Sequence, residues 1–153
     1  MTDPRQVAER AEQLFFQGYN CCEGVATALA EAMGAKCDCL PALATGMGGG
    51  VGHTGNMCGA VTGGAMGIGL AASRKKLKDH GAEKQWANER VAEFIEAFQR
   101  EFTVADCRSL IHIDFRSTDW LGQYKAGGCK AKCGRFVGFS AEWVARHLAE
   151  HGL

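Results

Sequence analysis

The stretch TGMGGGVGHTGNMCGAVTGGAMGIGL, residues 45–70, contains eleven of the 21 glycines in this 153-residue chain. Glycine loses more conformational entropy on ordering than other residues, so this density indicates backbone that approaches another group closely or adopts positive φ. No Asp, Glu, Lys or Arg occurs between Cys39 and Ser73. The segment is therefore expected to be buried.

The second half of this stretch predicts a helix with one bare face. Its glycines recur at every fourth position, Gly55, Gly59, Gly63 and Gly67, and residues four apart share a helix face. We expect this helix to begin near residue 56 and to fray over residues 73–78. Another helix, or a compact cofactor, can lie directly against the bare face.

A second stripe of small residues predicts how the chain assembles. Ala60, Gly64 and Ala71 lie about 100° around the same helix. The other amphipathic helices each offer one apolar face, so we expect a twofold homodimer with the central helices near its axis. The alternative is that residues 112–132 fold over the stripe and leave a monomer.

Three other interpretations of the glycine-rich stretch are weaker. The stretch has no GxxxxGK[ST] phosphate-binding motif and follows no strand of β-branched residues. A membrane span needs about 20 strongly apolar residues, and here glycine, threonine and asparagine dilute them. The glycines could also serve packing alone, with Cys58 as an inert small hydrophobe.

Composition excludes several function classes. Lys plus Arg equals Asp plus Glu at 17 each, so there is no field to attract nucleic acid or an anionic membrane. The N-terminus MTDPRQVAER lacks the pattern of a secretory signal, which favours the cytoplasm. In that reducing compartment the eight cysteines indicate metal ligands or redox thiols rather than a disulfide framework.

Periodicity and capping residues predict an all-α, single-domain helical bundle around the central glycine-rich helix, with no strand. Asp3 with Pro4, and Asn20 with Glu23, mark two helix starts, and Thr103 with Asp106 repeats the capping-box spacing. The remaining helices are expected at residues 3–17, 21–33, 83–101, 107–111 and 134–152, with a long loop at 112–132 within the one redox domain of residues 1–153.

Four cysteines lie within or just before the first turn of these helices: Cys21, Cys58, Cys107 and Cys133. Free amides and the positive end of the helix dipole lower a thiol's pKa and favour an anionic sulfur. Such a sulfur can act as a nucleophile or as a metal ligand. Glycines beside Cys58 would let backbone amides donate hydrogen bonds to the sulfurs of an iron–sulfur cluster.

These residues resemble a known family. Gly18-Tyr19-Asn20-Cys21, the glycine-rich run, the hexapeptide Cys58-Gly59-Ala60-Val61-Thr62-Gly63, and the later Cys107 and Cys133 are similar to the C_GCAxxG_C_C family of putative redox-active proteins. That family includes a domain of split-Soret cytochromes. The resemblance covers nearly the whole chain, and CGAxxG after a GGG run is its most specific element.

The resemblance implies an all-helical domain and an iron–sulfur cluster. The inherited ligands would be Cys21, Cys58, Cys107 and Cys133, with Gly59 also at the cofactor, and the split-Soret likeness favours [2Fe–2S] over [4Fe–4S]. The chain has no CxxCH, which excludes covalent haem. Its additional cysteines, Cys22, Cys37, Cys39 and Cys129, leave the choice of four ligands open.

The additional cysteines and the histidines allow further roles. Cys37 and Cys39 could bind a second metal or act as a dithiol, and Cys129, four residues before Cys133, could replace it as ligand. Zinc is the competing metal, but its Cys₄ sites usually use paired CxxC motifs, which this chain lacks. Among the histidines, His53 alone is expected near a cluster, where it could donate to a sulfur. Trp120 and Tyr124 are expected to serve packing.

The sequence therefore favours an iron–sulfur protein that exchanges electrons with a protein partner, as a carrier or redox subunit rather than a stand-alone enzyme. The alternative is a metal-free thiol/disulfide enzyme or sensor in which Cys58 is a nucleophile of low pKa. A third hypothesis is an all-α adaptor with inert thiols.

Overall fold

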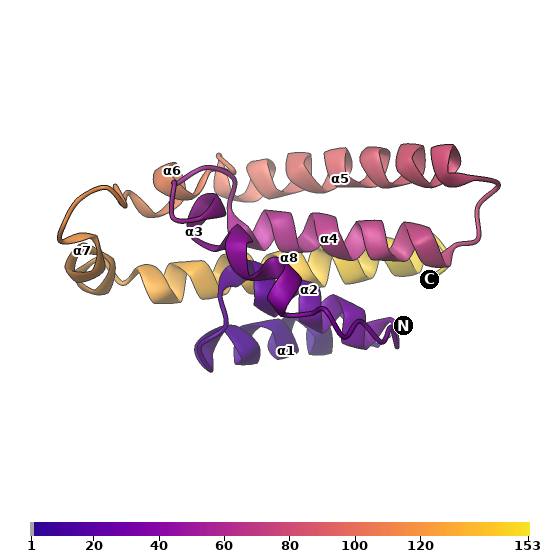
Figure 1. Ribbon diagram of the computed structural model, residues 1–153, viewed down its shortest axis with the longest axis horizontal. Coiled ribbons are helices and arrows are strands. Elements are labelled where there is room, and N and C mark those ends of the chain that lie inside the picture. Colours follow the sequence, from indigo (N-terminus) through magenta and orange to yellow (C-terminus); the bar gives the residue numbers. More distant parts are fainter. Residues whose placement is uncertain (1) are drawn as a thin grey trace.

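The computed structural model describes residues 2–153, in which eight α-helices and one 3-10 helix occur and no strand. The all-α prediction is confirmed. The elements are α1 (Pro4–Phe16), α2 (Cys21–Ala32), the 3-10 helix η1 (Ala42–Met47), α3 (Gly48–Val51), α4 (Gly59–Arg74), α5 (His80–Phe102), α6 (Cys107–Ile111), α7 (Trp120–Ala126) and α8 (Cys129–Glu150). Among the long helices, α2, α4 and α8 run in one direction and α1 and α5 in the opposite one, and α4 packs against α2, α5 and α8 (Figure 1).

The capping residues predicted from sequence form the expected hydrogen bonds. Asp3 accepts from the Arg5 amide at 3.0 Å, with Pro4 at the first position of α1. Asn20 and Glu23 form a reciprocal capping box at the start of α2, with bonds of 3.0 and 2.7 Å. Asp106 accepts from the Ser109 amide at 2.9 Å and begins α6. These bonds satisfy amides that a helix start leaves unpaired.

Thr103 has a different role from the one its spacing suggested. Its φ is 74°, and it forms the C-cap of α5, with its amide donating to the Gln99 carbonyl at 2.8 Å. The capping of α6 therefore depends on Asp106 alone.

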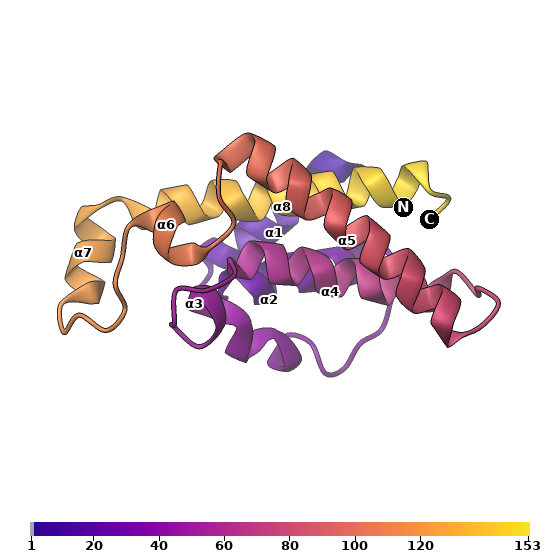
Figure 2. The same cartoon turned by 90° about the horizontal axis from the view of Figure 1, so that it is seen from above.

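The prediction for the C-terminal third was partly wrong. Helix α8 begins at Cys129, not after Cys133, and residues 120–126 form α7 inside the expected loop. The cause is Gly128, which adopts φ 62° and turns the chain from α7 into α8. Beyond it Cys129, Cys133 and Val137 continue one buried stripe with helical spacing. Figure 2 shows α7 beyond the end of the bundle.

The bare face of α4 packs against α2, as its spacing predicted. A Cβ added at Gly63 would lie 2.8 Å from the Cys22 carbonyl oxygen and 2.9 Å from the Val25 Cβ. Gly59 meets Cys21 and Gly67 meets Leu29 in the same way. Gly55 was wrongly included in this face, because it precedes α4 and adopts φ 75°.

The second stripe of α4 is covered within the same chain. Ala60 and Ala71 are fully buried, and a Cβ at Gly64 would collide with the ring of Phe94 on α5. Figure 1 shows α5 running alongside α4 over most of its length. The argument for a homodimer therefore fails, because α5 and not a second copy occupies this surface.

Among the described helices, none combines the length and the apolar character that crossing a bilayer requires. The expectation that residues 45–70 are buried is wrong for the first half of the stretch, where Thr45, Gly46, residues 51–54 and Asn56 are exposed. It holds for most of α4.

Candidate redox site

The site lies at the end of the bundle where α2, α4, α6 and α8 begin (Figure 1). Cys21 is the first residue of α2, Cys58 is the N-cap of α4, Cys107 is the first residue of α6, and Cys133 lies one turn into α8. All of them line one pocket of about 380 Å³. The structure thus brings together the four cysteines that the sequence singled out.

A short backbone pairing joins two of these cysteines. The Cys58 amide donates to the Ala105 carbonyl at 2.8 Å, and the Cys107 amide donates to the Asn56 carbonyl at 2.6 Å. Residues 56–58 and 105–107 therefore run side by side, with Met57 and Asp106 as an isolated antiparallel bridge. Because the two cysteines sit on paired backbone segments, the tertiary fold sets their separation.

Two glycines allow the elements to approach closely at the pocket. A Cβ at Gly59 would lie 3.0 Å from the Cys21 Cβ and 3.2 Å from the Cys22 amide nitrogen, so α4 contacts the start of α2 through bare backbone. Gly49 adopts φ 63°, and a side chain there would collide with the His53 ring. Gly59 lines the pocket, where we expected it.

Cys21 and Tyr124 are neighbours of Cys133 in the pocket. Residues of α2, α7 and α8 therefore meet at the Cys133 sulfur. Hydrogen bonds from Cys21 and Tyr124 lower the pKa of Cys133, since they favour its thiolate form. The same contact with Cys133, together with burial, raises the pKa of Cys21.

The other two thiols do not have the lowered pKa that helix starts predicted. Burial raises the pKa of Cys58 to about 12, although the nearby backbone amides of Ala60 and Val61 act in the opposite direction. Burial also raises the pKa of Cys107 to about 12. Desolvation outweighs the helix terminus because both side chains are enclosed in the bundle. Without a metal these two sulfurs stay protonated, so Cys58 is not a thiolate nucleophile.

One wall of the pocket consists of three aromatic rings, those of His53, Phe115 and Trp120, and it was not predicted from the sequence. The His53 ring lies 5.1 Å from both Phe115 and Trp120, centroid to centroid, and Phe115 lies 5.3 Å from Trp120. Trp120 and Tyr124 line the pocket, whereas packing alone had been expected for them. The available signal was their spacing of four, which places both on one face of α7. His53 lines the pocket, and its hydrogen bond to a cluster sulfur stays a prediction.

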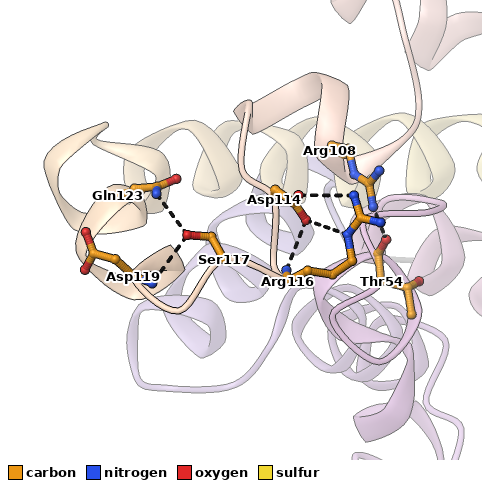
Figure 3. A network of polar contacts seen from close by, with 7 residues as sticks. All are labelled: Thr54, Arg108, Asp114, Arg116, Ser117, Asp119 and Gln123. Carbon is orange, nitrogen blue, oxygen red and sulfur yellow. Dashed lines mark hydrogen bonds and ion pairs between the residues drawn. The ribbon is translucent and has the colours of Figure 1, made fainter.

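Polar contacts order the segment between α6 and α7 and the loop before α4 (Figure 3). Arg108 of α6 donates to the Thr54 carbonyl at 3.0 Å, and Arg116 pairs with Asp114 at 3.0 Å. Ser117 accepts from Gln123 of α7 at 3.2 Å. The segment that carries Phe115 is thereby connected to α7.

The remaining cysteines lie outside the pocket lining. Cys22 is fully buried, with its sulfur 3.5 Å from the Met66 sulfur. Cys129 donates to the Ile111 carbonyl at 3.7 Å. Cys37 and Cys39 form a separate pair in the segment between α2 and η1. Of the two cysteines on the first turns of α8, only Cys133 faces the site.

Within residues 2–153, no group of three or more His, Cys, Asp or Glu side chains is placed to hold a single metal ion. Cysteine sulfurs are ligands for iron–sulfur clusters and for zinc, so the donor set that lines the pocket has the chemistry that either group requires.

A family model described as "Putative redox-active protein (C_GCAxxG_C_C)" matches residues 19–147. The chain belongs to this family. The resemblance inferred from sequence is thus confirmed, and the match spans all four cysteines of the pocket. No curated protein and no solved structure shows significant similarity to the chain.

Proposed function

We propose that this protein binds an iron–sulfur cluster through Cys21, Cys58, Cys107 and Cys133 and exchanges single electrons with a protein partner. The observation that carries the proposal is the convergence of these thiols, from four separate helices, on one pocket of about 380 Å³. The other four cysteines of the chain lie elsewhere, so the donor set is selected by the fold.

The pocket offers the surroundings that cluster sulfurs require. Backbone amides of Ala60 and Val61 lie near the Cys58 sulfur at the start of α4, and the Tyr124 hydroxyl is available to Cys133. Hydrogen bonds from such donors stabilise charge on ligand sulfurs and set the reduction potential. The cluster, when bound, supplies a one-electron couple. The aromatic wall of His53, Phe115 and Trp120 limits the access of water to it.

The partner is expected to present acidic groups. Lys125, Lys130, Lys132 and Arg135 are exposed on α7 and the first turns of α8, and no Asp or Glu occurs between residues 119 and 142. Lys130 itself lines the pocket. A local positive field beside a redox site speeds encounter with a negatively charged partner. We therefore expect the partner to be an acidic electron-transfer protein of the cytoplasm.

The test is iron and sulfide quantitation with EPR of the reduced protein after anaerobic purification. Cys133→Ser should lose the cluster, whereas Cys129→Ser, one turn earlier on the same helix, should keep it. About two irons per chain would indicate the favoured [2Fe–2S] form, and about four would indicate [4Fe–4S]. Equal cluster content in the two variants would reject the proposed ligand set.

A metal-free function is a second candidate because Cys21 and Cys133 are neighbours in the pocket and each affects the pKa of the other. Two neighbouring thiols can form a disulfide and so transfer two electrons. In this version Cys133, and not Cys58, attacks the substrate. A colourless protein with an intramolecular Cys21–Cys133 disulfide after mild oxidation would support it over the cluster.

A further inference from the structure

A second pair of cysteines lies outside the redox pocket, on the segment between α2 and η1. Cys37 and Cys39 flank Asp38, and their sulfurs are 2.9 Å apart. Cys39 is exposed and Cys37 is half-buried. Both sulfurs are within reach of a molecule that approaches the surface, unlike those of Cys22 and Cys129, which are buried.

Next to this pair is a hollow of about 200 Å³ with apolar walls. Cys37 lies in the wall, with Leu40, Leu43 and Met66 around it. Leu43 is 62% exposed, which is high for a leucine. A hollow of this size accepts one apolar side chain of a partner, beside the Cys37 sulfur.

We propose that Cys37 and Cys39 are a second redox site, a dithiol that reduces a disulfide in a polypeptide with an apolar residue next to its half-cystine. This site is independent of the proposed cluster. The apolar residue would occupy the hollow, which places the substrate's sulfur–sulfur bond at Cys37.

The two sulfurs have distinct roles in the exchange. Cys37, as thiolate, attacks one substrate sulfur, forms a mixed disulfide and releases the other substrate sulfur as a thiolate. Cys39 then attacks the Cys37 sulfur, closes the Cys37–Cys39 disulfide and releases the second substrate thiolate. Two protein thiols are oxidised, one substrate disulfide is reduced to two thiols, and the two thiol protons pass to the released thiolates.

The position of the two sulfurs agrees with this order. Cys37 lies in the wall of the hollow, where the substrate would bind, and Cys39 does not. The Cys39 sulfur is 2.9 Å from the Cys37 sulfur, within reach for the second step, and either sulfur can donate in the hydrogen bond between them.

The test uses the reduced full-length protein and oxidised glutathione as probe, with N-ethylmaleimide trapping and peptide mass mapping. The wild type should form an internal Cys37–Cys39 disulfide without a lasting glutathione adduct. In Cys39→Ser the adduct on Cys37 should persist at least roughly tenfold longer, because the intramolecular second step is lost. Cys37→Ser should react more slowly, and the buried control Cys22→Ser should match the wild type.

A pair of model peptide disulfides, with Leu or Ser beside the half-cystine, tests the hollow. The Leu peptide should react several-fold faster with the wild type. Lasting glutathione adducts on both Cys37 and Cys39 of the wild type would overturn the proposal. Iron measured in the same variants separates the two sites: Cys37→Ser should keep the iron content of the wild type. If Cys37→Ser loses iron instead, the pair is a metal ligand and the exchange role is rejected.

Discussion

At the level of single residues, Cys58 and Cys22 lie on opposite sides of the α2–α4 contact and differ in their surroundings. Cys58 lies at the start of α4 and lines the pocket, whereas Cys22 is 0% exposed and contacts Met66. We expect Cys58→Ser to abolish cofactor binding and Cys22→Ser to retain it, as measured by iron per chain. Equal loss of iron in both variants would contradict this assignment.

Tyr124 is a positioning residue whose hydroxyl bonds the Cys133 sulfur. Tyr124→Phe should keep the full iron content but make the reduction potential of the cluster more negative, because a donor to a ligand sulfur is lost. One neutral hydrogen bond of about 1 kcal/mol corresponds to roughly 40 mV for a one-electron couple. Spectroelectrochemical titration measures the shift. An unchanged potential would mean that the bond is absent in the loaded protein.

At the level of elements, the contact between α2 and α4 depends on the absence of side chains. In Gly63→Leu the new side chain would collide with the Cys22 carbonyl and with Val25, so the two helices must separate. We expect a loss of about 1–3 kcal/mol in the free energy of unfolding, measured with urea, and a lower iron content. The separation would also move Cys21 away from Cys58.

Gly69 provides a matched control on the same helix. Among the described residues, no atom lies within 4 Å of a Cβ added there. Gly69→Ala should therefore raise the free energy of unfolding by about 0.5–1 kcal/mol, because alanine is the better helix former. Native stability in Gly63→Leu would show that the face is not a close-packed interface.

At the level of the whole molecule, His147 links α8 to α5. Its Nε2 lies 2.7 Å from the Glu93 carboxylate, its ring stacks on Trp143, and its side chain is 15% exposed. Burial is the main cause that lowers the pKa of His147, the neighbouring His151 and Arg90 act in the same direction, and Glu93 opposes them. The unfolded chain, with a histidine pKa near 6.5, takes up the proton first.

Stability should therefore be greatest above about pH 7 and fall as the pH drops below about 6.5 toward the lowered pKa of the native state. Urea midpoints at pH 8 and pH 5.5 measure this loss. It should be smaller in His147→Gln and unchanged in His80→Gln, whose side chain is 83% exposed. The same loss of stability in His147→Gln as in the wild type would exclude this residue as the cause.

Local chemistry made most of the fold predictable. The starts of α1, α2 and α6 follow from Asp3, Asn20 and Asp106, because a capping side chain acts within three residues of its own position. The bare face of α4 could be predicted, because glycines at helical spacing leave one side of a helix free for close packing. Helix α7 was not predicted, because Trp120 and Tyr124 alone span too short a stretch to show helical periodicity.

The membership of the family and the set Cys21, Cys58, Cys107 and Cys133 were also accessible from sequence, through motif and order. Their convergence on one pocket was not, since it depends on α2, α4 and α8 beginning at the same end of the bundle and on the pairing of residues 56–58 with 105–107. The choice of Cys133 over Cys129 to face that pocket depends on the rotation of α8, which packing against the other helices sets.

The tertiary structure likewise determined the pKa values of the thiols and which residues cover the second stripe of small residues on α4. A helix start lowers a pKa over short range, but the burial that raises the pKa of Cys58 to about 12 comes from side chains distant in sequence. Gly64 is likewise covered by a residue distant in sequence, Phe94. The sequence pattern of a helix specifies which of its faces is apolar, bare or reactive. Only the packing of the whole molecule determines which other surface that face contacts.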